Sequence, residues 1–220
     1  METVLIMEDF QNPGGSGAPC GANAEYLTVV LAGGDALCRR LGPVLSGGVG
    51  VDVVAGCTVR GLLCDQLAIG PDYVEGRIQT VFLNGKPVDD IDAARVGERC
   101  TLALSAAMPG LVGATMRRGG RYAVLRKDIS HTGEADCPLE PEPICLTLKL
   151  FNLIAAELAP VLLKRGVWID GDGLADHMAL MGKAVWDVVA SARINEIPAG
   201  QEAIVSALRG QRVYLRVASP

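Results

Sequence analysis

The residues best suited to chemistry lie in the loop from Pro109 to Gly120, PGLVGATMRRGG, which follows an expected strand. Exposed backbone N–H groups at a helix start attract anions, and glycines let a ligand approach the backbone closely. Arg117, Arg118, Arg121, Arg126 and Lys127 add five positive charges with no acid among them. We therefore predict a site for an anionic small molecule, a phosphate or a carboxylate, formed by Gly110, Gly113, Thr115, Arg117, Arg118 and Arg121.

The same loop has a simpler interpretation, a tight turn whose arginines form a solvated basic face. These arginines could pair with the acids between Glu134 and Glu142. The loop also lacks the G-K-[ST] ending of a nucleotide-binding P-loop. Both interpretations stay open at the level of sequence.

Three further groups contain residue types that occur in metal or catalytic sites, but their spacing in the sequence does not match such sites. His131, Asp136, Cys137 and Cys145 lack the short chelating pair of a structural zinc site, so we expect no metal and no cofactor. The acids of DGDGLAD, residues 170–176, fit a turn followed by a capped helix better than a calcium loop. The acids Asp89, Asp90 and Asp92 are either a carboxylate cluster for metal or acid–base work, or solvated side chains.

Composition narrows the class of protein. Half of the 220 residues are hydrophobic and only 4% are aromatic, so the core must be aliphatic. A net charge of −5 argues against nucleic-acid binding, which needs a basic surface. No apolar run is long enough for a membrane span, so we expect no membrane partner. The acidic start, METVLIMEDF, does not resemble a signal peptide, and the seven cysteines are dispersed, which together predict a cytoplasmic location.

Hydrophobic periodicity and turn residues predict alternating strands and helices. Thr58 is a natural N-cap for a helix, and Asn84-Gly85 is a strong hairpin signal. The expected strands are 3–7, 26–32, 49–54, 78–83, 101–107, 121–126, 144–150 and 211–218. The expected helices are 35–41, 58–69, 152–165, 174–192 and 201–208.

The order of elements from residue 26 to residue 110 resembles the β-grasp fold. The helix TVRGLLCDQL, followed by VFLNGKPVDD and by LALS, looks like the sulfur-carrier branch of that fold. A carrier needs a free C-terminal Gly-Gly, whereas Met108-Pro109-Gly110 is internal here, so the resemblance implies architecture and not carrier chemistry. The fold class expected is α+β, a β-grasp-like mixed sheet with a smaller C-terminal α/β part.

We expect a β-grasp-like part at 1–131, an acidic linker or loop containing prolines at 132–143, and a C-terminal part at 144–220. A single integrated domain is the alternative. The chain has two histidines and no G-x-S-x-G elbow, so a hydrolase triad has little support and the catalytic residues, if any, are unknown. The favoured function is a non-enzymatic binding or accessory protein with the anion site above. The alternatives are an enzyme whose residues come from distant segments and a module that forms homo-oligomers or binds a protein, through sheet edges or the strand of Tyr214.

Overall fold

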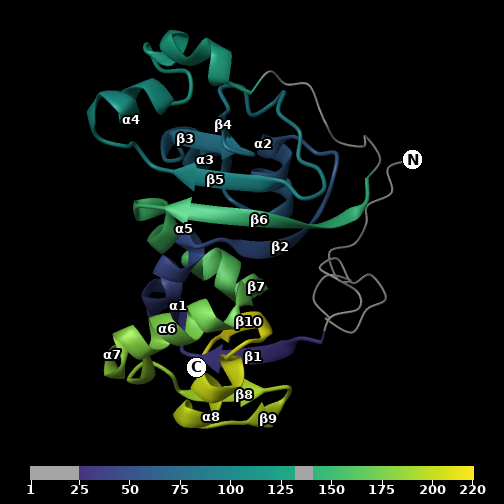
Figure 1. The fold of residues 1–220 in the computed structure, drawn as a ribbon, viewed down its shortest axis with the longest axis vertical. Coiled ribbons are helices and arrows are strands. Elements are labelled where there is room, and N and C mark those ends of the chain that lie inside the picture. Colours follow the sequence, from purple (N-terminus) through teal and green to yellow (C-terminus); the bar gives the residue numbers. More distant parts are fainter. Residues whose placement is uncertain (1–24, 132–140) are drawn as a thin grey trace.

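The computed structural model describes residues 25–131 and 141–220 (Figure 1). The expected acidic linker therefore lies outside the described residues, except for positions 141–143. Within the described part, helices and a ten-stranded mixed sheet give an α+β protein, as the sequence predicts.

Six strands follow the predicted positions closely, and four short strands, β4, β7, β8 and β9, are additions. Their bounds are β1 (Leu27–Ala32), β2 (Val49–Val54), β3 (Thr80–Leu83), β4 (Lys86–Pro87), β5 (Thr101–Ser105), β6 (Pro143–Phe151), β7 (Val167–Asp170), β8 (Ser191–Ile194), β9 (Ile197–Pro198) and β10 (Arg212–Ala218). The strand expected at 3–7 lies outside the described residues.

The helices include short 3₁₀ and π segments. Their bounds are α1 (Gly34–Leu41), η2 (Gly42–Ser46), α2 (Val59–Gly61), η3 (Leu62–Gln66), α3 (Pro71–Gly76), α4 (Gly110–Met116), η4 (Ala123–Ile129), α5 (Leu153–Arg165), α6 (Gly171–Met181), α7 (Lys183–Trp186) and α8 (Gln201–Leu208). None of the helices described in 25–131 and 141–220 is long and apolar enough to cross a membrane.

The sheet has the order β4-β3-β5-β6-β2-β7-β10-β1-β8-β9. The succession of parallel and antiparallel strand pairs is the same from either edge of the sheet. The parallel pairs are β5 with β6 and β1 with β10, and each lies at the same distance from the central antiparallel pair of β2 and β7. A hairpin closes each end of the sheet, β3–β4 on one side and β8–β9 on the other. The described sheet thus consists of two halves with matching strand directions.

Both hairpins turn through an asparagine with positive φ. Asn84 and Gly85 have φ of 51° and 77°, and Asn195 and Glu196 have φ of 46° and 71°. Positive φ at both central residues gives the turn twist that matches paired strands, and asparagine tolerates it better than most residues. The sequence signal at Asn84-Gly85 is therefore confirmed, whereas Asn195-Glu196 carried no glycine to reveal the second turn.

An aliphatic core lies between the sheet and its helices. Alternate residues are buried along β2 (Val49, Val51 and Val53) and along β6 (Ile144 to Leu150), as the period of two predicts. Helix α5 packs against α1 and β10, while α6 packs against α8. Figure 1 shows α1, α5 and α6 grouped at the middle of the long axis, below β5 and β6.

Strand β1 lies between β10 and β8, and strand β6 lies between β5 and β2. The first strand, β1, therefore belongs to the half that is otherwise built from β7 to β10, and β6 belongs to the half that is otherwise built from β2 to β5. The remaining elements that the resemblance used, from β2 through the Asn84-Gly85 turn to β5, are neighbours in one half.

Two predicted elements were wrong. Residues 121–126, expected as a strand, belong to the segment that enters the 3₁₀ helix η4, because Arg126 is drawn inward by polar contacts. The helix expected to run from 174 to 192 ends at Gly182, whose φ is 48°, and Ser191–Ile194 instead form strand β8. Left-handed backbone at a glycine is a common helix terminus.

Candidate functional site

The predicted anion-binding loop forms most of a projecting lobe, which we define as residues 109–130 and which contains α4 and η4 (Figure 1). Helix α4 begins after Pro109, which is extended and has no N–H to leave unpaired. Gly113 is required by packing, since a Cβ there would lie 2.1 Å from the carbonyl oxygen of Met108. Helices α4 and η4 pack against each other, so the lobe is a folded unit and not an extended loop.

Arg126 holds this lobe to the body of the protein. Its side chain is 3% exposed and makes a bidentate pair with Asp89, with Nη1 donating to Oδ2 at 3.0 Å and Nη2 to Oδ1 at 2.7 Å. Its Nε donates to the carbonyl oxygen of Thr115 at 2.6 Å, and Asp89 Oδ1 also accepts from Gly119 N at 3.0 Å. Bidentate arginine–carboxylate pairs fix geometry as well as charge. The lobe is therefore held firmly beside the segment that follows β4.

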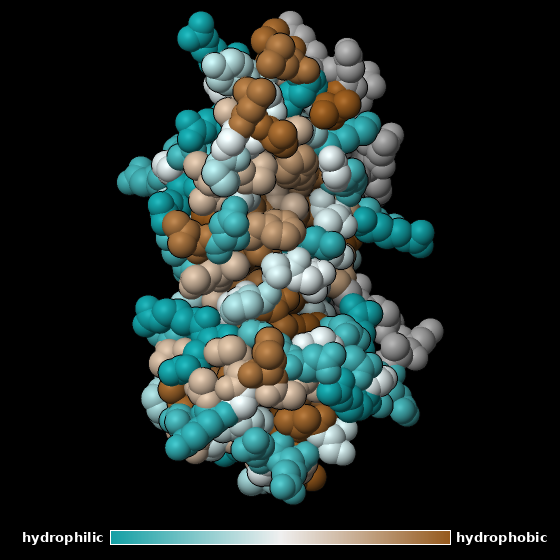
Figure 2. All heavy atoms as spheres, turned by 60° about the vertical axis from the view of Figure 1, so that its left-hand side comes forward, coloured by the Kyte–Doolittle hydropathy of each residue, from teal (hydrophilic) through white to brown (hydrophobic). Residues whose placement is uncertain are grey.

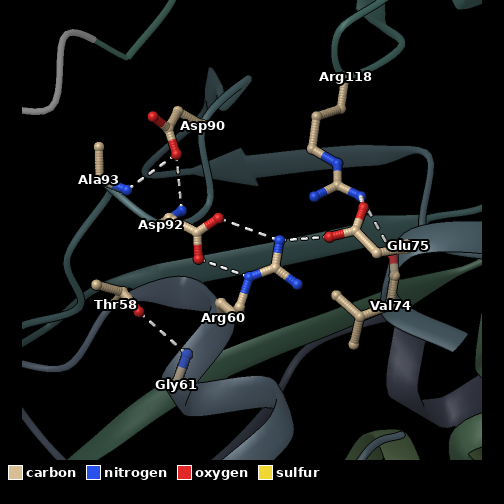
Figure 3. Close-up of polar contacts among 9 residues, drawn as sticks. All are labelled: Thr58, Arg60, Gly61, Val74, Glu75, Asp90, Asp92, Ala93 and Arg118. Atoms are coloured by element: carbon tan, nitrogen blue, oxygen red, sulfur yellow. Dashed lines mark hydrogen bonds and ion pairs between the residues drawn. The ribbon is translucent and has the colours of Figure 1, made fainter. Parts of the chain in front are cut away.

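A second network of arginines and acids lies beside Asp89 (Figure 3). Arg60 donates from Nε to Asp92 Oδ1 at 2.5 Å and also bonds Glu75 through Nη2. Arg118, from the lobe, donates to the other oxygen of Glu75 at 3.0 Å and to the carbonyl oxygen of Val74 at 3.3 Å. Glu75 thus bridges two guanidinium groups that come from α2 and from the lobe.

Arg60 lies at the start of α2, where Thr58 acts as the predicted cap. Thr58 Oγ1 accepts from Gly61 N at 3.1 Å, which confirms the N-cap. Facing it, Asp90 Oδ1 accepts from the backbone N–H groups of Asp92, at 2.9 Å, and Ala93, at 3.1 Å. These two local caps place the carboxylate of Asp92 against Arg60.

The network surrounds an open hollow of about 480 Å³. Four carboxylates and two guanidinium groups line it, so the lining has an excess of negative charge. The lining residues are Arg60, Glu75, Asp89, Asp90, Ile91, Asp92, Arg118 and Gly119. Two sets of residues that the sequence singled out separately, the arginine loop and the acids at 89–92, therefore meet in one place.

The ion pairs of Arg60 shift the pKa values of the charged groups that form them. The hydrogen bond from Arg60 lowers the pKa of both Glu75 and Asp92, and the same two acids raise the pKa of Arg60. Groups of this kind remain ionised near neutral pH, whereas a general acid or base needs a pKa near the working pH. The carboxylates that pair with Arg60 are therefore fixed charges.

The six residues predicted to bind an anion do not converge on one point. Thr115 Oγ1 donates to the carbonyl oxygen of Val112 at 2.7 Å, and Arg118 is held by Glu75. Gly113 is buried and Gly110 is open on the surface. Arg117 and Arg121 are exposed, and neither side chain has a hydrogen bond or ion pair with the described residues. The anion site stays a prediction that rests on these two arginines.

Other residues that the sequence singled out have structural partners. Asp170 caps α6 by accepting from Gly173 N at 2.8 Å, and Asp176 pairs with Arg209 at 2.7 Å. Asp172 accepts from Gly210 N at 3.2 Å. Asp172 and Asp176 share Arg209, while Asp170 caps the helix, which confirms the capped helix. Asp136 and Cys137 of the zinc hypothesis lie outside the described residues, and the described ranges contain no cluster of three metal-ligating side chains.

Three of the free thiols among the described residues are shifted away from reactivity. Burial raises the pKa of Cys57 and Cys64, and it raises that of Cys38 to about 11. A nucleophilic or redox-active cysteine needs the opposite shift. These three thiols are therefore structural.

Sequence reasoning missed the most conspicuous property of the lobe, its exposed apolar side chains. Six of them are between 44% and 70% exposed: Leu111, Val112, Tyr122, Val124, Leu125 and Ile129. Figure 2 shows hydrophobic residues gathered at that end of the molecule, with hydrophilic residues around them. Isolated exposed apolar residues are normal, but a group of this size indicates an interaction site. The only signal in the sequence is the apolar content of GLVGATM and YAVL between glycines and arginines.

A second cluster lies at the junction of the two halves of the sheet. Trp168 on β7 contacts the rings of Tyr26, at 4.8 Å, and Tyr214, at 5.0 Å, and Arg212 lies 5.3 Å from its ring centroid. Trp168 Nε1 donates to Asp52 Oδ2 at 2.9 Å, and burial raises the pKa of Asp52. The strand of Tyr214 is therefore an interior strand of the sheet, with its aromatic residue packed against Trp168 and not free at an edge.

Comparison with known proteins adds no relative to this description. No protein-family model, no curated protein and no solved structure matches the chain.

Proposed function

We propose that this chain is a non-enzymatic binding or accessory protein that docks onto another macromolecule through the lobe at 109–130. The observation that carries the proposal is the combination of exposed apolar side chains and a buried clamp in one segment. Leu111, Leu125 and Ile129 are more than half exposed, while Arg126 at the base of the same segment is 4% exposed. Apolar surface that is held rigidly in water is typical of a preformed docking surface.

The charged hollow supports binding over catalysis. Its Arg60, Glu75 and Asp92 are mutually paired, and the pKa shifts keep all three charged. Fixed charges beside an apolar surface determine which partner fits and in what orientation. The lobe would supply the contact area and the hollow would supply selectivity.

An anionic small molecule at Arg117 and Arg121 is the second candidate function. It is favoured by one observation, the exposure of these two guanidinium groups without an acid partner among the described residues. Arg118, the third arginine of the predicted site, is already paired with Glu75 and is 11% exposed. The remaining site would thus consist of two flexible side chains and would bind anions weakly.

We also propose that residues 49–151 form the β-grasp-like unit that the sequence resembles. The support is the strand order β4-β3-β5-β6-β2, with a parallel pair inside it and α2 following β2. The sequence resemblance used residues 26–32 as a strand of this unit. In the structure β6 takes that role, because it lies between β5 and β2, whereas β1 lies in the other half of the sheet. NMR contacts between backbone amides that do not pair β6 with β5 would contradict this proposal.

The docking proposal is tested by site-specific photo-crosslinking in the cells that make the protein. A photoreactive side chain replaces Leu125 in the lobe, and the matched control replaces Leu180 on α6, which is 84% exposed but lies outside the lobe. We expect a discrete adduct from position 125 and none from position 180. Absence of an adduct at 125, or the same adducts at both positions, would show that the lobe is not a docking surface.

A further inference from the structure

The exposed apolar area of the lobe indicates how large a surface a partner must cover. The six exposed side chains present surface on the order of several hundred Å², compared with about 800 Å² per partner in a standard protein interface. This is at or above the largest apolar patch of a typical monomer, about 300 to 600 Å². A partner must therefore cover the lobe and a neighbouring polar area as well.

The neighbouring polar area carries one uncompensated negative charge. Both oxygens of Asp92 bond Arg60, those of Glu75 bond Arg60 and Arg118, and those of Asp89 bond Arg126. Asp90 differs, since its Oδ1 accepts only two backbone N–H groups and no arginine pairs with it among the described residues. Asp90 is exposed at the surface and lines the hollow.

The lobe carries uncompensated positive charges within a few residues. Arg117 and Arg121 flank the turn whose Gly119 lines the hollow and bonds Asp89. Both side chains are exposed, without an acid partner in the described part of the chain. The exposed apolar side chains of the patch and the two cations left unpaired among the described residues therefore belong to the lobe, and the unpaired anion belongs to the hollow that the lobe meets at Arg118 and Gly119.

A two-fold interface needs a surface that complements itself, because each contact from residue i to residue j recurs from j to i. The lobe and the hollow together have this property. We infer that the lobe binds a second copy of this chain, with the apolar patches in contact and with Arg117 and Arg121 of each copy directed at Asp90 of the other. This inference rests on the docking function proposed above.

The test is a charge exchange followed by mixing, measured by sedimentation velocity on the full chain. Arg117→Asp with Arg121→Asp makes one variant, and Asp90→Arg makes the other. Each variant alone places like charges opposite each other in a homodimer, which is destabilising. When the two are mixed, every pair is again of opposite charge, so a heterodimer forms.

We expect the wild-type chain to sediment as a dimer of twice 23.0 kDa at micromolar concentrations. Each variant alone should raise the dimer dissociation constant by roughly tenfold or more, and the equimolar mixture should restore it. Asp90→Asn is the fold control, since it keeps an oxygen for the N–H groups of Asp92 and Ala93. Circular dichroism of each variant shows whether it is folded, and Leu125→Asp provides a second way to weaken the dimer.

A wild-type chain that stays monomeric overturns the inference, and so does a dimer that none of these variants weakens. A mixture of folded variants that fails to associate contradicts the two-fold pairing as well. Photo-crosslinking at position 125 distinguishes a failure of the dimer inference from a failure of the proposed docking function. An adduct with a mass other than that of two chains leaves the docking function standing with a different partner, whereas no adduct rejects both.

Discussion

Arg126 and Asp89 form a two-point ion pair across 37 residues of sequence, with N–O distances of 2.7 Å and 3.0 Å. Arg126 is almost fully buried, while Asp89 is 38% exposed at the edge of the hollow. The pair joins the lobe to the segment after β4, and Asp89 also holds the turn at Gly119. Together with the bonds of Arg118 to Glu75 and Val74, this pair sets the position of the apolar patch relative to the acidic hollow.

Replacing Arg126 should release the lobe and lower the stability of the protein. Arg126→Ala leaves Asp89 without its partner and leaves the carbonyl oxygen of Thr115 without a donor. We expect a loss of about 2 to 3 kcal/mol, at the low end for a buried pair because Asp89 is partly hydrated. For a chain of this size that lowers Tm by about 2 to 4 °C per kcal/mol. The control Arg121→Ala, at an exposed position of the same lobe, should change Tm little.

The patch on the lobe should be replaceable without loss of stability. Leu125 is 70% exposed, so Leu125→Asp removes little buried contact and should change the free energy of unfolding by about 0.5 kcal/mol or less. The same change should abolish docking, since a charge would be buried in the interface. Chemical denaturation and sedimentation measure the two effects separately. Leu180→Asp on α6 is the matched control and should alter neither.

The buried carboxyl of Asp52 predicts a specific dependence on pH. Burial raises its pKa in the folded protein above the value of 3.8 that it has when unfolded. The folded state therefore binds the proton of Asp52 more tightly than the unfolded state does. Ionising Asp52 lowers the free energy of unfolding, and this loss is absent below pH 3.8 and appears as the pH rises through the pKa of the folded state. Asp52→Asn removes this cost and keeps an acceptor for Trp168 Nε1, 2.9 Å away in the native chain.

We therefore expect Asp52→Asn to be more stable than the wild type at pH 7, with the advantage shrinking as the pH falls through the raised pKa of Asp52 and absent below pH 3.8. Thermal unfolding across this range measures it. An advantage that is constant with pH would mean that the Asp52 carboxyl is not the titrating group. Asp90→Asn, at an exposed position, serves as the control.

The anion site is tested with inorganic phosphate as the probe. If Arg117 and Arg121 bind anions, phosphate should raise Tm in the wild type, because a ligand that binds only the folded state stabilises it. The double variant Arg117→Ala with Arg121→Ala should lose that increase. Arg193→Ala, which removes an exposed arginine on β8, should retain it. An equal increase in all three proteins would exclude this site.

Local signals in the sequence predicted local structure well. The Thr58 cap, the turn at Asn84-Gly85 and the alternation from Ile144 to Leu150 all depend on residues close in the chain, and all three are present. The position of β1 could not be predicted in this way. It pairs with β10, almost two hundred positions away, and nothing local to residues 27–32 specifies that partner.

The candidate site was predicted only in part for the same reason. Sequence reasoning noted Arg118 and the acids at 89–92 but had no way to bring them together, because Glu75 and Asp89 reach the lobe from distant segments. The segment RYAVLR has the alternation of a strand, yet the pairing of Arg126 with Asp89 turns it into η4. Exposure of Val124 and Leu125 follows from that turn and is a tertiary property.

Amide hydrogen exchange, compared between concentrated and dilute solutions of the wild-type chain, tests the docking role of the lobe most directly. We predict slower exchange at high concentration in residues 109–130 and in the hollow at 89–92, with no change in α6 or α8. Leu125→Asp should remove this difference. Equal exchange at both concentrations, or protection confined to other elements, would contradict docking of a second copy through the lobe.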